Sequence, residues 1–296
     1  MNDHRPSENP FDLSNDSAYR HWRDAKMADY PTRLDQLVVE VKNAKNLTAP
    51  EHEAILQRLQ KTNMALYAAD PVETRDKEII RTLGQQFGLE RLDHNMCADN
   101  DAITSLTVQP DALHKGYIPY TTRPIAWHTD GYYNDMEHQI LALLLHCVEP
   151  AASGGANQLL DHEVVYIRLR ELDPAHITAL MHPQAMTIPA NISEGKELRP
   201  ARTGPVFIVQ PDGSLHMRYT DRSRSIEWRD TPETTNAVKT LKEILHNDSP
   251  HHFEGTLQRG QGLISNNVLH TRSVFDEGGT ERLLYRARYY DRITNT

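Results

Sequence analysis

The run Trp127-His128-Thr129-Asp130-Gly131 contains two candidate metal ligands, on which the prediction of the fold and of the site rests. In an extended segment, residues two apart point to the same face, so the His128 imidazole and the Asp130 carboxylate can converge on one metal ion. The pattern His-x-Asp is common by chance, and it also fits a surface strand on which both side chains are solvated. A further ligand elsewhere in the chain has to decide between these two interpretations.

A second histidine, His270, stands at the end of an apolar strand in the run Asn266-Asn267-Val268-Leu269-His270-Thr271-Arg272. Two imidazoles and one carboxylate form the facial set that is typical of non-haem iron oxygenases. Three protein ligands leave other positions on the metal open for a cosubstrate and dioxygen. The sequence therefore predicts a metal site made of His128, Asp130 and His270.

A strand that begins 12 residues after His270 (282 − 270) is rich in arginine. Alternation along it places three arginines on one face, namely Arg282, Arg286 and Arg288, and three apolar side chains on the other, namely Leu283, Tyr285 and Ala287. Arginines are costly to bury unless they meet anions, and the planar guanidinium can bind a carboxylate through two hydrogen bonds. A solvated edge strand is the alternative. We expect these arginines to bind anions.

The fold class follows from the distribution of strands. Beyond about residue 100 the chain becomes strand-rich with few regular βαβ alternations, which favours a mainly β fold with flanking helices around a double-stranded β-helix (jelly-roll) core. We expect a loose polar arm over residues 1–24, a helical extension over 25–100 packed on the core, and the jelly-roll core with a helical insertion over 101–296.

Individual elements are predicted from hydrophobic periodicity and turn residues. Helices are expected over 51–69 (capped by Thr48), 73–87, 163–172, 174–181 and 231–247. Strands are expected over 102–108, 139–148, 158–160 and 262–265, with 282–290 following across a loop, and a hairpin is expected from 205–209 and 214–219.

Composition narrows the classes of partner. The 296 residues carry 32 Lys and Arg against 41 Asp and Glu, a net charge of −9, which disfavours binding to nucleic acid or to an anionic membrane surface. No stretch is apolar enough to span a membrane, and the N-terminus does not resemble a secretory signal. The two cysteines, Cys97 and Cys147, suggest no disulfide framework, so a cytoplasmic location is expected. The oligomeric state is left open, a homo-oligomer included.

The ordered succession WHTDG, LLLHCVEPAASGG, GLISNNVLHTRSVF and RLLYRAR resembles the taurine dioxygenase and γ-butyrobetaine hydroxylase superfamily of Fe(II)/2-oxoglutarate oxygenases. The resemblance runs in order from about residue 100 to about residue 290. It implies that His128, Asp130 and His270 hold the iron. It also implies that Arg282 pairs with the distal carboxylate of 2-oxoglutarate and that Arg286 meets an anionic end of the substrate.

Some relatives use the later arginines for the cosubstrate, so the roles of Arg282, Arg286 and Arg288 stay open between cosubstrate and substrate. Asn157 stands where the family often has a threonine that helps to hold 2-oxoglutarate, and an amide can still donate a hydrogen bond there. Tyr132 is a further candidate for contact with the substrate.

The function implied by the resemblance is that of an Fe(II)- and 2-oxoglutarate-dependent dioxygenase. Such an enzyme uses O2 to hydroxylate an unactivated C–H bond of a small, anionic substrate and releases succinate and CO2. The carboxylate of Asp130 favours hydroxylation or desaturation over halogenation, because halogenating relatives lack it. The alternatives are a cupin-type metal enzyme that needs no 2-oxoglutarate and a non-catalytic barrel that acts as a sensor.

Overall fold

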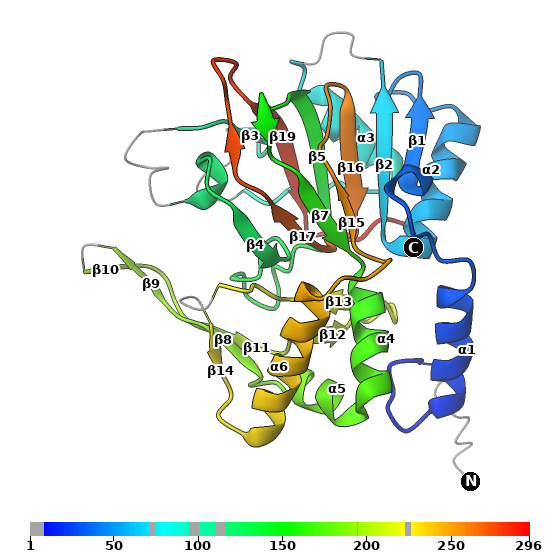
Figure 1. Ribbon diagram of the computed structural model, residues 1–296, viewed down its shortest axis with the longest axis vertical. Coiled ribbons are helices and arrows are strands. Elements are labelled where there is room, and N and C mark those ends of the chain that lie inside the picture. Colours follow the sequence, from blue (N-terminus) through cyan, green and yellow to red (C-terminus); the bar gives the residue numbers. More distant parts are fainter. Residues whose placement is uncertain (1–8, 71–74, 95–100, 110–116, 194, 223–225) are drawn as a thin grey trace. The chain divides into compact units, whose positions relative to one another are not determined.

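The computed structural model describes residues 9–70, 75–94, 101–109, 117–193, 195–222 and 226–296. The chain divides into two compact units. The sheet unit comprises residues 31–161, 219–222 and 248–296, and the helical unit comprises residues 1–30, 162–218 and 223–247. Figure 1 labels the elements of both.

The larger sheet of the sheet unit has six strands in the order β1-β2-β16-β5-β19-β3. Strands β1 and β2 are parallel, and the other neighbours are antiparallel. Their bounds are β1 Val38–Val41, β2 Met64–Ala69, β3 Thr104–Leu106, β5 Ala142–Glu149, β16 Gln261–Ser265 and β19 Leu283–Tyr289. The apolar run in β5 is buried on both faces, which explains why it shows no alternation.

Helices α2 (Ala49–Thr62) and α3 (Glu78–Gln86) cover one face of this sheet. The hydrophobic core lies there and includes Ile55, Leu59 and Leu83 of the helices. Thr48 and Glu51 form a capping box at the start of α2, as the sequence predicts. The alternating apolar residues of β19 point into this core, so its arginines face the opposite side.

The smaller sheet has four strands in the order β15-β7-β17-β4. Their bounds are β4 Ile125–His128, β7 Asn157–Leu160, β15 Phe253–Gly255 and β17 Leu269–Arg272, and a two-stranded ladder joins β6 (Ser153–Gly154) to β18 (Phe275–Asp276). Short 3-10 turns stand at η1 Leu34–Leu37 and η2 Ile118–Tyr120. A cavity of about 110 Å³ is lined from the large sheet by Leu145 and Leu263 and from the small one by Asn157 and Leu159. Two sheets that enclose an interior agree with the predicted jelly-roll core.

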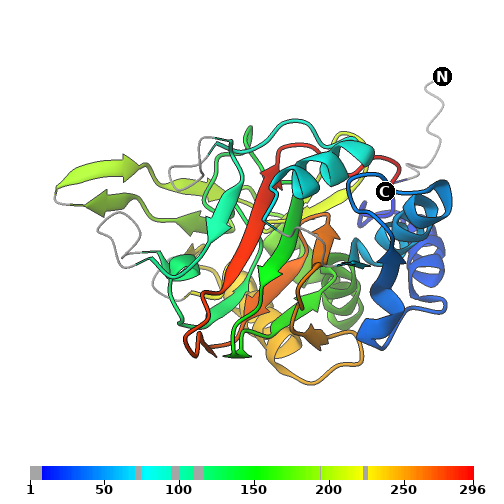
Figure 2. The same cartoon turned by 90° about the horizontal axis from the view of Figure 1, so that it is seen from above.

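The helical unit contains most of the remaining helices and three small ladders. The helices are α1 Asp16–Met27, α4 His162–Leu172, α5 Pro174–Leu180 and α6 Pro232–His246. The strands are β8 Met186–Ile188, β9 Asn191–Ser193, β10 Lys196–Arg199, β11 Arg202–Gly204, β12 Phe207–Val209, β13 Leu215–Met217 and β14 Glu227–Trp228. The β12–β13 hairpin is the one that the sequence predicts. The β9–β10 hairpin reaches out from the three-stranded β11-β8-β14 sheet, as Figure 2 shows.

Several expectations about the first hundred residues are wrong. The helix expected over 51–69 ends at Thr62, because Asn63 takes a left-handed conformation (φ 57°) and residues 64–69 form β2. Helix α1 begins within residues 1–24, the stretch expected to be a loose arm, and continues to Met27. Trp22 packs edge-on against Phe11 and Tyr166, with 5.0 and 6.3 Å between ring centroids. That packing partner is 144 residues away in the chain (166 − 22), so no local pattern reveals it.

Other expectations lie close to the structure. The helix expected over 73–87 is α3, although residues 71–74 lie outside the described residues. The strands predicted at 262–265 and 282–290 are β16 and β19, but β5 separates them in the sheet. None of the described helices is long and apolar enough to cross a membrane. Cys147 is buried in β5, and Cys97 lies outside the described residues. The predicted division at residues 24 and 100 stays a prediction.

Candidate metal centre and anion site

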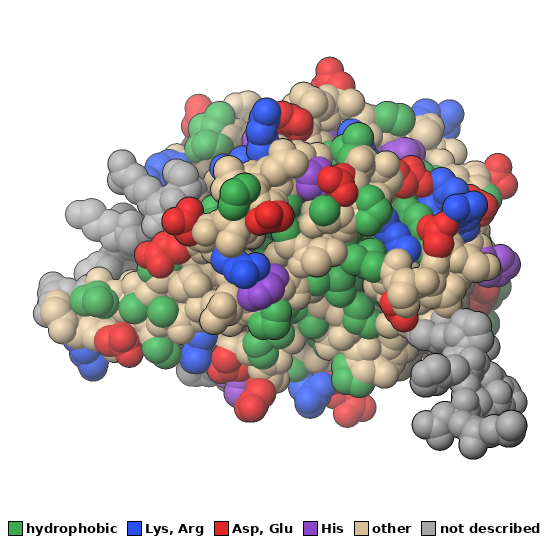
Figure 3. All heavy atoms as spheres, turned by 90° about the horizontal axis from the view of Figure 1, so that it is seen from below, with side chains coloured by type: hydrophobic (Ala, Val, Ile, Leu, Met, Phe, Trp, Pro, Cys, Tyr) green, Lys and Arg blue, Asp and Glu red, His purple; other side chains and the backbone are tan. Residues whose placement is uncertain are grey.

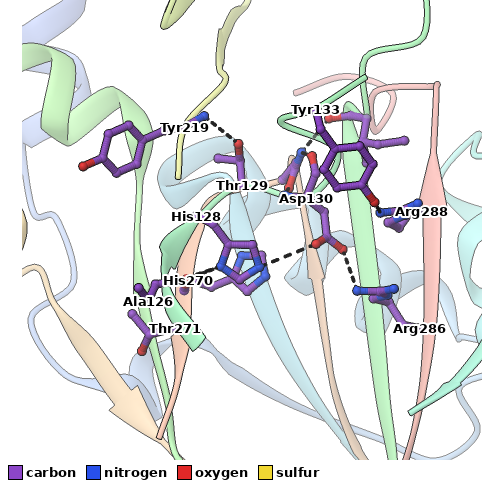
Figure 4. A network of polar contacts seen from close by, with 12 residues as sticks. Ala126, His128, Thr129, Asp130, Tyr133, Tyr219, His270, Thr271, Arg286 and Arg288 are labelled. Carbon is purple, nitrogen blue, oxygen red and sulfur yellow. Dashed lines mark hydrogen bonds and ion pairs between the residues drawn. The ribbon is translucent and has the colours of Figure 1, made fainter. Parts of the chain in front are cut away.

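The structure brings His128, Asp130 and His270 together in the sheet unit (Figure 4). His128 is the last residue of β4, and it pairs directly with His270 of the antiparallel strand β17. The chain turns after β4, so Asp130 reaches the same point. One potential ligand atom from each residue lies within 4.8 Å of the others. Among the described residues this is the one group of His, Cys, Asp and Glu side chains with that geometry.

Both imidazoles are oriented by main-chain carbonyls. His128 Nδ1 lies 3.0 Å from the carbonyl oxygen of Ala126 and 3.1 Å from that of His270, and His270 Nδ1 lies 3.0 Å from that of Val268. A nitrogen that donates to a carbonyl carries the proton, so Nε2 of each ring keeps its lone pair. Metal-binding histidines are usually held in this way.

The main chain of Asp130 is clamped by Asn267, which lies just before β17. Asn267 Oδ1 accepts a hydrogen bond from Asp130 N at 2.8 Å, and Asn267 Nδ2 donates to the Asp130 carbonyl at 2.9 Å. After Asp130 the chain turns at Gly131 with φ 69°, where a Cβ would lie 2.3 Å from Ile140. Only glycine fits this turn. The turn and the clamp together fix the direction of the Asp130 side chain.

The charges at this point suit a carboxylate and neutral imidazoles. Burial works to raise the pKa of Asp130, but Arg286, the contact with His128 and Arg288 outweigh it and hold the pKa well below its usual range. Burial, helped by the neighbouring His128, lowers the pKa of His270 to about 4. At neutral pH Asp130 therefore offers a carboxylate, and His270 offers a neutral imidazole with a lone pair.

A divalent transition metal fits these residues. Oδ2 of Asp130 is buried without a hydrogen-bond donor, and its ion pair with Nη1 of Arg286 is long at 3.5 Å. The other oxygen, Oδ1, lies 3.6 Å from Nε2 of His128. Non-haem Fe(II) sites use two imidazoles and one carboxylate on one side of the metal, and the coordination positions on the opposite side stay open.

The three arginines predicted to share one face of β19 meet different surroundings. Arg288 is buried and already paired, because its guanidinium donates to Asp93 and, at 2.9 Å, to Tyr133 Oη. Tyr290 Oη donates to the other oxygen of Asp93 at 2.6 Å. Arg286 faces Asp130, as Figure 4 shows. The two later arginines of the strand therefore both have a carboxylate beside them.

Arg282, just before β19, differs from both. Its side chain is 5% exposed, yet its guanidinium donates no hydrogen bond and forms no ion pair with any described residue. It packs over the ring of Phe275, with 4.8 Å from Cζ to the ring centroid, and lies near Gly155. A buried cation without an anionic partner is costly, so this guanidinium is the best candidate to receive an anion.

Asn157 and Tyr132 complete the predicted set. The amide of Asn157 donates to the carbonyl of Thr271 at 2.7 Å and lines the cavity between the sheets. Tyr132 packs edge-on against Tyr133, with 5.2 Å between centroids. Burial raises the pKa of Tyr132 against the effects of Arg222 and of a hydrogen bond with Thr220. Tyr132, two residues after Asp130 in the chain, thus lies beside the positive charge of Arg222.

Sequence reasoning missed three residues that shape these sites: Asn267, Asp93 and Arg272. Asn267 has a left-handed conformation (φ 52°), which asparagine tolerates better than most residues, and its position just before an apolar strand is a weak signal. Asp93 and Arg272 carried no signal, because each depends on partners far away in the chain.

Comparisons with known proteins place the chain in a family. The family model described as "Taurine catabolism dioxygenase TauD, TfdA family" matches residues 30–288. A uridine-5'-phosphate dioxygenase from Amycolatopsis sp is 30% identical over 187 residues, which cover 61% of this chain and 66% of that protein. One from Streptomyces sp is 30% identical over 200 residues, covering 64% and 69%.

Solved structures share the fold at low sequence identity. An asparagine oxygenase in complex with Fe(II), hydroxyasparagine and succinate has a TM-score of 0.56 at 14% identity, covering 82% of this chain and 84% of that one. The protein AAD-2 in complex with Mn(II) and N-oxalylglycine has a TM-score of 0.61 at 12% identity, covering 88% and 97%. These neighbours confirm the predicted fold class.

Proposed function

The chain belongs to the taurine catabolism dioxygenase TauD, TfdA family, and on that premise we propose that it oxidises an unactivated C–H bond of a small anionic molecule. The family confirms the predicted class, a dioxygenase that depends on Fe(II), 2-oxoglutarate and O2. It gives no support to a cupin-type enzyme without 2-oxoglutarate or to a non-catalytic sensor. The observation that carries the proposal is a convergent His128–Asp130–His270 set combined with an unpartnered buried cation at Arg282.

In this proposal His128, Asp130 and His270 hold the iron. When bound, the iron supplies the redox chemistry that couples oxidative decarboxylation of 2-oxoglutarate, to succinate and CO2, with oxidation of the substrate. The clamp from Asn267 and the carbonyls that orient the two imidazoles keep the ligand atoms in place before the metal arrives. The side chains of His128 and Asp130 are 12% and 6% exposed, which limits the access of water to them.

Arg282 is assigned to the distal carboxylate of 2-oxoglutarate. Arg288 is a poor candidate, because Asp93 and Tyr133 already occupy its guanidinium. Arg286 lies against a metal ligand, so an anion that it binds would lie beside the metal. Asn157 holds the carbonyl of Thr271, and we assign it to the wall of the cosubstrate pocket without a direct hydrogen bond to the carboxylate.

The substrate is proposed to be a small anion that approaches between Arg286 and Tyr132. Arg222 lies near Tyr132 and adds a second positive charge. Because both named relatives are uridine-5'-phosphate dioxygenases, a nucleoside 5'-phosphate is the first substrate class to test. A phosphate would suit two guanidiniums better than a neutral substrate would. Arg288 is assigned to holding Tyr133 in place.

The test is O2-dependent release of succinate by protein reconstituted with Fe(II). The panel contains uridine-5'-phosphate, other nucleoside 5'-phosphates, uridine, and small carboxylates and sulfonates. The proposal predicts succinate formation that a phosphate monoester stimulates and that uridine does not. It also predicts loss of both Fe(II) binding and turnover in His128→Ala and Asp130→Ala, whereas the exposed control Asp35→Ala retains both. Full activity in the two ligand variants would sink the assignment.

A further inference from the structure

Two buried guanidiniums pack on the ring of Phe275. Arg272 packs on it with 4.9 Å from Cζ to the ring centroid, and Arg282 packs on it at 4.8 Å. Both arginines are 5% exposed, and Phe275 is 6% exposed. An aromatic face attracts a cation, so one ring stabilises two positive charges that would otherwise repel each other.

The Arg272 side chain is hydrogen-bonded to residues 118–123, the segment that leads into β4. Its guanidinium donates to the carbonyl oxygens of Ile118, Pro119, Thr121 and Arg123, at 3.3, 3.0, 2.6 and 2.6 Å. Phe275 N adds a hydrogen bond to the Thr122 carbonyl at 3.2 Å. The segment 118–123 is therefore tied at five carbonyls to β17 and β18, and it ends two residues before the strand that carries His128.

Arg282 has nothing comparable to hold its guanidinium. Its main-chain N donates to Glu277 Oε1 at 3.2 Å, but its side chain has the Phe275 ring as its packing partner and no described hydrogen-bond acceptor. Burial, and then the charge of Arg282, lower the pKa of Arg272 to about 9, so Arg272 stays protonated at neutral pH. The guanidinium of Arg282 is likewise charged, because arginine keeps its proton in proteins. Two like charges therefore share this ring, and neither forms an ion pair with a carboxylate in the described part of the chain.

We propose that Phe275 and Arg272 are positioning residues for the cosubstrate. Phe275 holds the Arg282 guanidinium ready for the distal carboxylate of 2-oxoglutarate, and Arg272 transmits carboxylate binding to segment 118–123. The inference rests on the proposed function and extends it. A carboxylate at Arg282 neutralises one of the two charges, which removes the repulsion felt by Arg272 and leaves it more firmly bound to its carbonyls.

The first experiment measures 2-oxoglutarate affinity by calorimetry on Mn(II)-loaded full-length protein, which does not turn over. Phe275→Leu is expected to weaken binding by about 3- to 30-fold, the range that a desolvated cation–π contact supports. Phe275→Tyr keeps the ring face and should stay within about twofold of wild type on the same reasoning. In turnover, Phe275→Leu should raise KM for 2-oxoglutarate with little change in kcat.

The matched control is Phe87→Leu, which removes a buried ring from the core on the helix-covered face of the large sheet. This control should lower the thermal midpoint but leave 2-oxoglutarate affinity at the wild-type value. Equal affinity in wild type and Phe275→Leu would overturn the inference, as would an equal loss in Phe87→Leu. Failure of the wild type itself to bind 2-oxoglutarate would contradict the proposed function, and this inference with it.

The second experiment follows hydrogen exchange of the amides in segment 118–123. Thr121 N and Tyr120 N donate to main-chain carbonyls, so their exchange reports opening of the segment. In wild type, adding 2-oxoglutarate to the Mn(II)-loaded protein should slow their exchange. In Arg282→Met, which has no charge for the carboxylate to neutralise, this slowing should be lost at ligand concentrations that saturate the site. Slowing of the same size in both proteins would overturn the transmission by Arg272.

Discussion

The two ends of β19 bury arginines in opposite electrostatic surroundings. At the end near the metal-binding candidates, Arg286 faces Asp130 and Arg288 is bound to Asp93 and Tyr133. At the other end, Arg282 and Arg272 share the ring of Phe275, and no carboxylate of a described residue forms an ion pair with either of them. Arg286 and Arg288 of β19 thus each lie beside a carboxylate. Arg282, just before the strand, forms no ion pair with a described carboxylate.

The difference shows where the molecule needs an anion from outside. Burying a charge costs several kcal/mol or more, and a nearby opposite charge normally offsets this cost. Arg272 is compensated in part by four carbonyl oxygens, whereas Arg282 has an aromatic face and the charge of Glu277, with which it forms no ion pair. A dicarboxylate cosubstrate that binds Arg282 would compensate the charge of this arginine, as Asp93 compensates the charge of Arg288.

The largest expected effect is on stability at the compensated end. Asp93→Ala removes one partner of a buried ion pair and leaves the Arg288 guanidinium uncompensated, so the free energy of unfolding should fall by about 3–5 kcal/mol. Urea denaturation measures this. The control Asp35→Ala breaks a fully exposed pair with Arg33 and should leave the free energy of unfolding close to that of wild type. Equal effects of the two substitutions would contradict the comparison.

The next effect is stabilisation by the missing anion. For the Mn(II)-loaded protein, 2-oxoglutarate at a hundred times its dissociation constant should raise the free energy of unfolding by about 2.7 kcal/mol. Glutarate has both carboxylates but lacks the 2-oxo group that chelates metal, so at the same concentration it should stabilise less. A thermal-shift series with both ligands measures the difference. No shift with either ligand would argue against an anion site in this part of the protein.

Arg282→Met should have effects of opposite sign on binding and on stability. Loss of a charge-assisted hydrogen bond should weaken 2-oxoglutarate binding by about 1.5–3 kcal/mol, whereas the ligand-free protein should be as stable as wild type or more so. Calorimetry and urea denaturation of the same variant test both. A ligand-free protein destabilised as much as Asp93→Ala would show that Arg282 has a structural partner.

The smallest effect is expected at Asn157. Its amide donates to the Thr271 carbonyl, so Asn157→Ala should lower the free energy of unfolding by about 0.5–1.5 kcal/mol. Affinity for 2-oxoglutarate should change little, because the amide is already engaged. A loss of affinity as large as that in Arg282→Met would instead place the amide on the carboxylate, as the threonine at this position in the family implies.

The features that could be predicted depend on residues that are close together in the sequence. The alternation along β19 follows from strand geometry, and the structure confirms it. His128 and Asp130 do converge, but β4 ends at His128 and Asp130 lies in the turn that follows it. The sequence pattern alone could not show that Arg282 and Arg288 have different surroundings. Arg288 pairs with Asp93, which is 195 residues away in the chain. The strand β2 was misread as helix for a related reason: its burial depends on β16, far along the chain.

The most direct test is a crystal structure of the protein with Mn(II) and 2-oxoglutarate. The account predicts the metal on Nε2 of His128, a carboxylate oxygen of Asp130 and Nε2 of His270, with the distal carboxylate of 2-oxoglutarate bound to the Arg282 guanidinium beside Phe275. A distal carboxylate on Arg286 or Arg288, with Arg282 left without an anion, would contradict it.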